Sequence, residues 1–227
     1  VAGLDAGSIH VAKSDGTFSG DQDPAHLQAA FDGTLPRIET FSGETAATFD
    51  WAAGKGVLES AQGKIGAYPF SLDTPAGIVF GKNSAALETS HWHTGEGTLS
   101  LAAARGKQGI RVDASWDGIP AGMVFMRAAA ERHGRIGGAI AVHGLPQAPT
   151  GTASVTLKGM YAGPEADNAP ALSAEATADI APNAVSFQAN AALVGFGEAR
   201  ANGTVPLATD PGGLPDLAWD QPLAGAF

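Results

Sequence analysis

The sequence predicts an all-β protein, built as one elongated, curled antiparallel sheet, and three observations lead to this prediction. Apolar and polar residues alternate at period two along most of the 227 residues. Glycine (31 residues) and proline (14 residues) recur often enough to place turns between the alternating runs. Continuous apolar runs separated by helices, the mark of a doubly wound parallel sheet, are missing. A closed β-sandwich is the alternative fold, because it would show the same alternation in its sequence.

The alternating runs can be followed along the chain in order. Residues 24–33, PAHLQAAFDG, fit a short helix, but their alternation equally fits a strand. The later runs give each strand one apolar face and one polar face. They are FSGETAATFDW (41–51), QGIRVDASWDG (108–118), GTASVTLKG (151–159), ALSAEATADIAP (171–182) and AVSFQANAALVG (184–195). This pattern is typical of antiparallel strands that are half buried and joined by short turns.

One segment stands apart from the alternation. Residues 122–134, GMVFMRAAAERHG, are rich in good helix formers and end on glycine, so they are the best candidate for a helix. No sharp domain boundary is visible, and residues 1–227 are expected to form a single region of a longer chain. The one weak break is expected at MYAGPEADNAP (160–170), which is polar and flanked by proline.

The composition excludes several classes of function. A net charge of -10 with only 16% charged residues argues against nucleic acid as a partner, because phosphates bind basic surfaces. The absence of cysteine excludes disulfides, thiolate metal sites and thiol nucleophiles. No segment approaches the ~18 consecutive apolar residues that a membrane-spanning helix requires.

The search for catalytic or metal-binding residues yields none. His91 and His93 lie two residues apart in SHWHTGEG and would share one face of a strand, with Glu88 or Glu96 as a possible carboxylate. No further histidine follows at ligand spacing, so we expect two exposed imidazoles with Trp92 buried between them, and no metal. P-loop, Gly-x-Ser-x-Gly and EF-hand patterns are also missing. The sequence therefore predicts no enzyme, no cofactor and no metal.

The apolar face remains as the candidate functional surface. It consists mainly of small side chains, which suit a broad, smooth groove for acyl chains better than an interdigitated core. The alternative is the dry core of a closed sandwich. The residues expected to line the groove are Phe49, Trp51, Leu99, Leu101, Ile110, Val112, Trp116, Ile140, Val142, Val155, Leu157, Leu172, Ile180, Val185, Phe187, Leu193, Val205 and Leu207.

Several segments resemble the repeated phrases of the TamB family, the inner-membrane component of the translocation and assembly module. These segments are IRVDASWDGIPAG (110–122), RIGGAIAVHGLPQAPTGTASVTLKGM (135–160), ARANGTVPL (199–207) and LPDLAWDQPLAGAF (214–227). Each follows the pattern of a strand, a glycine and a turn that contains proline. The likeness extends from about Gly97 to the C-terminus and more faintly back to Gly33. Residues 1–32 lack recognisable turns of this kind.

The resemblance implies a taco-shaped β-sheet with a hydrophobic groove, similar to AsmA-like and bridge-type lipid-transfer proteins. Such a parent protein would be anchored in the inner membrane of a Gram-negative cell and would cross the periplasm. The function that the resemblance implies is phospholipid transport between the inner and outer membranes, or the assembly of outer-membrane proteins together with a partner, an Omp85-type, TamA-like barrel. The implied ligands are phospholipid acyl chains, and no catalytic residue is needed. The alternative function is a β-sandwich binding module or a structural, adhesin-like module.

Overall fold

The computed structural model describes residues 2–6, 9–19, 24–35, 38–124, 132–162, 170–208, 216–217 and 224–226. The first strands are β1 (Ala2–Ala6), β2 (Ile9–Ser19), β3 (Ala25–Leu35), β4 (Ile38–Asp50), β5 (Lys55–Ile65), β6 (Tyr68–Leu72), β7 (Ala76–Gly81), β8 (Ser84–Thr94) and β9 (Gly97–Gly106). They are followed by β10 (Gly109–Pro120), β11 (Arg132–Leu145), β12 (Ala148–Ala162), β13 (Leu172–Ala181), β14 (Ala184–Leu193), β15 (Gly197–Ala208), β16 (Asp216–Leu217) and β17 (Ala224–Ala226).

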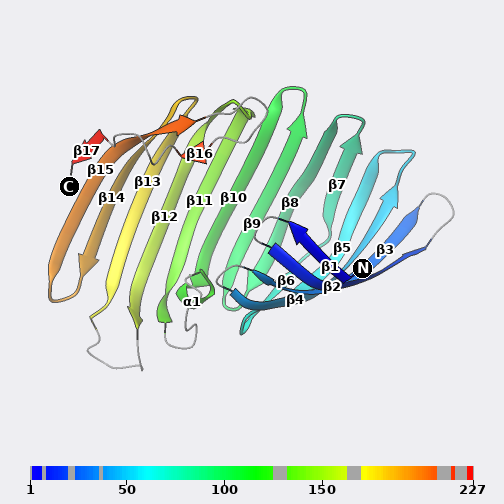
Figure 1. Ribbon diagram of the computed structural model, residues 1–227, viewed down its shortest axis with the longest axis horizontal. Helices are drawn as coiled ribbons and strands as arrows, with labels where there is room; N and C mark the ends of the chain where they lie inside the picture. Colours follow the sequence, from blue (N-terminus) through cyan, green and yellow to red (C-terminus); the bar gives the residue numbers. More distant parts are fainter. Residues whose placement is uncertain are drawn as a thin grey trace.

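The strands form an antiparallel meander, in which each long strand pairs with its neighbours in the sequence (Figure 1). β6 and β7 together occupy one position between β5 and β8. The short β16 and β17 both pair with β15 at the C-terminal end. All strands of the described residues thus belong to one sheet, which confirms the predicted all-β curled sheet. The sandwich alternative would require two facing sheets.

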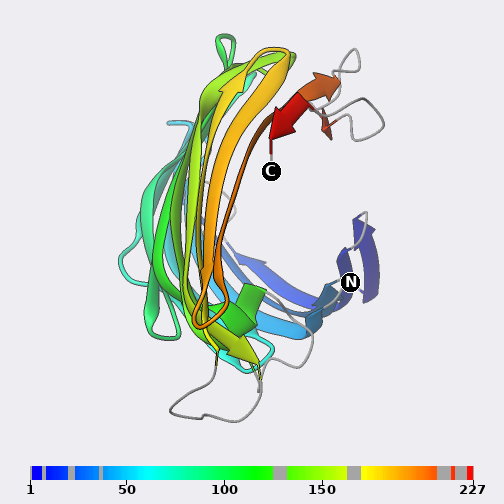
Figure 2. The ribbon, with the colours of Figure 1, turned by 90° about the vertical axis from the view of Figure 1, so that its left-hand side faces the viewer.

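The sheet is curled about its long axis, so that it is C-shaped in cross-section, with the N- and C-terminal strands near the opening (Figure 2). Three bulges contribute to the bending, because a bulge bends the strand that contains it. They lie near the same end of β10, β11 and β12, at Gly118, Gly134 and Gly159. These glycines have φ values of 66°, 112° and 62°, a region that other residues rarely adopt.

The apolar residues face the inside of the curl and the polar residues face the outside. The short helix α1 (Ala121–Val124) lies within the curl in Figure 2 and contacts β10 and β11. Ile119 and Ile136, which pair across β10 and β11, are only 8% and 5% exposed. Ala121 and Met123 of α1 are buried beside them. Cross-strand partners share a face, so this buried group identifies the apolar side of the whole sheet as the concave side.

The structure corrects the helix prediction for residues 122–134. Of the described residues in this segment, those up to Val124 are helical, and residues 132–134 already belong to β11. Residues 125–131 of the expected helix lie outside the described residues. Pairing with β12 decides the conformation of the C-terminal part, where His133 registers with Tyr161 and stacks on its ring at 4.4 Å between centroids. Here strand pairing overrides the local helical propensity.

The segment 24–33, which fits a helix or a strand, is a strand, because β3 pairs along its length with both β2 and β4. Across the weak break expected at residues 160–170, β12 and β13 pair directly, while residues 163–169 lie outside the described part. Within the described residues, no helix is both long and apolar enough to span a membrane.

Candidate functional site

The concave face is the candidate site, and the strand register brings the expected lining residues together on it. Leu99 registers with Trp116, Val112 with Val142, Leu172 with Leu193, and Val185 with both Ile180 and Val205. The remaining lining residues share this face through their alternation with those positions. These are Phe49, Leu101, Ile110, Ile140, Val155, Leu157, Phe187 and Leu207. Trp51 lies in the turn after β4 and stacks on Phe49, with 5.2 Å between the ring centroids.

The side chains of this face are half buried, unlike those of a packed core. Val155, near the middle of the sheet, is 41% exposed, and Leu157, Phe187 and Leu193 are of intermediate exposure. Full burial is confined to a few positions, such as Val205 at 4% and the group beneath α1. A core residue is normally enclosed by side chains on every side. The concave face therefore presents apolar surface that the described residues leave open.

Four aromatic rings of the concave face cover a glycine of the neighbouring strand. A Cβ placed on Gly138 would be 2.6 Å from Cζ2 of Trp116, and one placed on Gly63 would be 2.7 Å from Cζ of Phe70. Gly43 beneath Phe31 and Gly56 beneath Phe49 repeat the arrangement, each with a distance of 2.8 Å. Glycine leaves room for a ring above the neighbouring strand, so these large side chains add apolar area to the face.

Polar groups on the concave face are few and mostly satisfied within the sheet. Ser90 is 1% exposed, and its hydroxyl donates to the carbonyl of Leu101 at 3.0 Å. The same hydroxyl accepts a hydrogen bond of 2.9 Å from the indole N–H of Trp92. Thr94 is also buried, and its Oγ1 has no hydrogen-bond partner among the described atoms. Among the described residues, the concave face is therefore apolar almost throughout.

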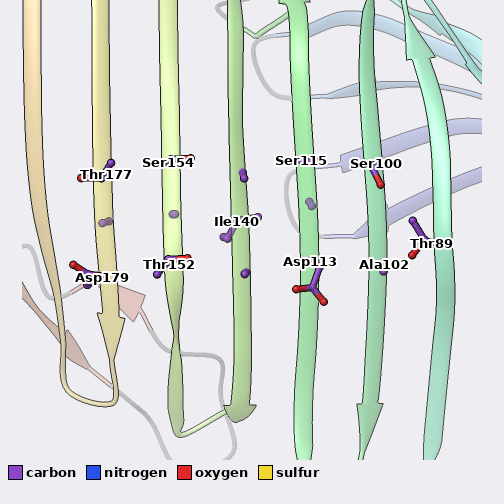
Figure 3. A pocket seen from close by; sticks show the side chains of 15 residues that line it. Thr89, Ser100, Ala102, Asp113, Ser115, Ile140, Thr152, Ser154, Thr177 and Asp179 are labelled. Atoms are coloured by element: carbon purple, nitrogen blue, oxygen red, sulfur yellow. The ribbon is translucent and has the colours of Figure 1, made fainter.

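The convex face carries the hydroxyl and charged groups. A shallow depression of about 630 Å³ spans β8 to β13 on this face and is shown in Figure 3. Two cross-strand rows of short polar side chains line much of it. One row contains Ser100, Ser115, Ser154 and Thr177, and the other contains Asp113, Thr152 and Asp179. No tryptophan of the described residues faces this side, so it lacks the aromatic platforms typical of carbohydrate sites.

The histidine pair lies on the convex face as its spacing predicted. His91 and His93 are both exposed, while Trp92 between them points to the concave face and is half buried. His93 forms an ion pair with Asp73, which precedes β7. The described part of the chain contains no group of three or more metal-ligating side chains. The exposed His93–Asp73 pair is therefore a surface contact between neighbouring segments.

A second charged contact joins the β8–β9 turn to β11. The Arg135 guanidinium donates to the carboxylate of Glu96 and, through Nη1, to the carbonyl of Gly118 at 3.1 Å. The hydrogen bond from Arg135, reinforced by its positive charge, lowers the pKa of the Glu96 carboxyl. Both side chains are exposed, so this contact positions a turn and contributes little to stability.

Several residues of the concave face were not among the lining residues that the sequence analysis predicted. They are Leu27, Phe31, Leu58, Phe70, Ile78, Phe80, Trp92, Ile119 and Ile136. The signal was present for most of them, because they follow the same period-two alternation as their neighbours. Ile119 was the exception, because the bulge at Gly118 shifts the alternation by one residue.

Comparison with known proteins identifies no relatives: no protein-family model, no curated protein and no solved structure matches the chain.

Proposed function

We propose that this chain is a non-enzymatic lipid carrier, in which the concave face holds the acyl chains of phospholipids. The observation that carries the proposal is the separation of the two faces of one open sheet. From β3 to β15 the described concave face consists mainly of aliphatic, aromatic and small residues, with Arg105 as its charged side chain, whereas the other charged groups lie on the convex face or in the turns. A soluble protein with a large open apolar face needs an occupant for that face.

The physical chemistry of the face suits an acyl chain better than a protein segment. Each methylene transferred from water to an apolar surface gains about 0.8 kcal/mol, so a long chain supplies its own affinity. The rings of Trp116 and Phe70 occupy the space that a side chain would take at Gly138 and Gly63. A hydrocarbon chain places no hydrogen-bonding demand on the sheet, so it can move from one strand to the next without leaving a polar group unpaired.

The resemblance of residues 110–122, 135–160, 199–207 and 214–227 to the TamB family extends the proposal to the parent protein. We infer that the chain is one section of a periplasmic bridge that carries phospholipid between the inner and outer membranes. In that setting, the parent would be anchored in the inner membrane and would work with an Omp85-type barrel of the outer membrane. Because no family model matches, this extension depends on the sequence resemblance and on the open apolar face together.

The test is to ask whether the purified chain carries lipid. The chain is purified from Gram-negative cells and analysed by native mass spectrometry, and its organic extract is analysed for phospholipid. We expect bound phospholipid in the native spectrum and diacyl phospholipid in the extract. A protein that carries no lipid, and that takes up none from added phospholipid, would refute the proposal.

A matched pair of variants locates the bound lipid. Leu101→Asp, Val155→Asp and Phe187→Asp together place three charges on the concave face, and lipid binding should be lost because desolvating a carboxylate is costly. Ser100→Asp, Ser154→Asp and Gln188→Asp place the same charges on the adjacent convex positions and should retain the lipid. Circular dichroism checks that both proteins fold, and Val155→Asp alone serves if the triple variant does not.

The convex depression supports a second candidate function, a binding or adhesin-like module that presents its hydroxyl rows to a partner (Figure 3). Loss of lipid binding in the convex variant, with binding kept in the concave variant, would favour this alternative.

A further inference from the structure

Three hairpin turns at one edge of the sheet share a feature that the acidic composition does not predict. The β4–β5, β7–β8 and β9–β10 turns each contain a Gly-Lys pair, at Lys55, Lys82 and Lys107. Residues 81–84 and 105–109 contain no acidic residue, whereas in the β4–β5 hairpin Asp50 is the cross-strand partner of Lys55. The three hairpins lie next to one another along the upper edge of the sheet in Figure 1. The chain as a whole has 23 acidic and 13 basic residues, so this edge concentrates positive charge against the overall balance.

Arg105 joins this group from the concave side. It continues the alternation of Leu101 and Ala103 along β9 and registers with Ala85 on β8 and Ile110 on β10. Among the described side chains of the concave face, Arg105 is the one that carries a charge. Its guanidinium is exposed and makes no ion pair with any described residue.

The register places these cations close together. Phe80 lies between β5 and β8, since its amide donates to the carbonyl of Gly54 at 2.8 Å and it pairs with Ala85. Ala85 in turn pairs with Arg105. With neighbouring strands about 4.8 Å apart, the backbones at Lys55 and Arg105 are separated by about 14 Å. Lys82 and Lys107 project from the turns on either side of β8 and β9. Lys55 pairs with Asp50 and shares the convex face with Val79, so we call the other three cations, Lys82, Arg105 and Lys107, the basic edge.

An aromatic cluster adjoins the basic edge on the concave side. Trp51 stacks on Phe49 and lies 5.1 Å from Phe80, measured between ring centroids. Trp51 is 55% exposed, in the turn where the apolar face meets the polar edge. Tryptophan is favoured at such boundaries, because its ring is largely apolar while its N–H is polar. The cluster therefore marks the border between the acyl-binding surface and solvent.

We propose that the basic edge binds the phosphate group of an anionic phospholipid whose acyl chains lie on the concave face, an inference that rests on the proposed function. The cations provide charge-assisted hydrogen bonds to the phosphate oxygens, and the planar guanidinium of Arg105 suits a bidentate contact. Because Arg105 sits on the apolar side of the edge, it holds the phosphate where the glycerol backbone reaches the apolar surface. A lipid with net negative charge is preferred over a zwitterionic lipid, whose own cation offsets the attraction.

The test measures headgroup preference separately from acyl-chain binding. The 227-residue chain is mixed with equal amounts of phosphatidylglycerol and phosphatidylcholine with identical dioleoyl chains, and the bound lipids are quantified by mass spectrometry. We expect about a five- to tenfold preference for phosphatidylglycerol, from a few exposed charge contacts. The preference should shrink as salt is raised. Glycerol 3-phosphate without acyl chains should not displace the lipid.

Matched variants assign the preference to the basic edge. The triple variant Lys82→Gln, Arg105→Gln, Lys107→Gln should bind both lipids nearly equally while retaining total lipid bound. The control Lys64→Gln, Lys158→Gln, Arg200→Gln removes the same charge from the convex face and should keep the preference.

Each remaining outcome decides a different claim. Equal binding of both lipids by the unaltered chain, or a preference that survives in the basic-edge variant, refutes the inference and leaves the proposed function standing. Displacement by glycerol 3-phosphate alone would assign the edge to a soluble phosphate ester and would refute it too. If neither lipid binds, the proposed function fails and the inference fails with it.

Discussion

The indole ring of Trp116 on β10 covers Gly138, its partner on β11, so closely that a Cβ on Gly138 would be 2.6 Å from Cζ2 of the ring. The same Cβ would also press on the carbonyl oxygen of Ser154 on β12. The glycine therefore allows both the ring and the next strand to approach closely. The same relationship between a ring and a glycine recurs on the concave face at Gly43, Gly56 and Gly63.

Gly138→Ala should lower the free energy of unfolding by about 1–3 kcal/mol, because the new methyl group displaces the indole ring and strains the β11–β12 pairing. Part of this cost should disappear in a Trp116→Leu background, which a double-mutant cycle of urea unfolding would measure. Gly106→Ala is the control, since the nearest atom to its Cβ would be 4.0 Å away. Equal costs in both backgrounds would show that the ring does not depend on the glycine.

Val155→Asp should leave the protein folded, at a cost of about 1–3 kcal/mol, because the side chain is 41% exposed and the new carboxylate keeps part of its water. Ser154→Asp on the opposite face should cost less than about 0.5 kcal/mol. Circular dichroism and urea unfolding provide both values. Complete unfolding of the Val155 variant alone would mean that this side of the sheet is a closed core.

Substitutions on the convex face should be tolerated, as their exposure predicts. Arg111 and Asp113 form an ion pair of 2.6 Å with the two side chains 73% and 39% exposed. Arg111→Gln should change the free energy of unfolding by less than about 0.5 kcal/mol, and the same is expected for Ser115→Ala and Lys158→Gln. Thermal unfolding monitored by circular dichroism measures each change. Costs above about 2 kcal/mol at most of these positions would mean that the faces are assigned the wrong way round.

Arg135→Gln should raise the pKa of the Glu96 carboxyl towards its ordinary value, because the hydrogen bond and the charge of Arg135 lower it. A lowered pKa in the folded state means that the contact stabilises the fold at pH values above the ordinary pKa of glutamate. That contribution is lost as the pH falls through the folded-state value. Carboxyl titration by NMR measures the shift, and Arg200→Gln should leave it unchanged. An unaltered Glu96 titration in the Arg135 variant would contradict the assigned contact.

His91 and His93 are expected to bind no structural metal, since the described residues contain no group of three metal-ligating side chains that could hold an ion. Treatment with a chelator should leave the thermal unfolding temperature unchanged, in the native chain and in a His91→Ala, His93→Ala variant alike. A fall of several degrees in the native chain alone would reveal a metal site that includes these histidines.

The alternation of residues by itself determined the strands and the two faces of the sheet. Period two is a local property, so Val112, Ala114 and Trp116 share a face wherever their strand lies. The same logic separates His91 and His93 from Trp92. The short Gly-containing turns likewise predicted a meander, because they leave each strand beside its neighbour in the sequence.

Only the tertiary structure decided which way the sheet curls and which distant residues meet. Bulges occur near the same end of three adjacent strands, and the bulge at Gly118 places Ile119 on a face that the period-two alternation does not predict. Pairing with β12 turns residues 132–134 into a strand despite the helical character of the preceding sequence. The cations of the basic edge come from hairpins about 25 residues apart in sequence, and only the register brings them side by side. Pairing between distant strands depends on residues from many parts of the chain, whereas the alternation is a property of each strand's own sequence.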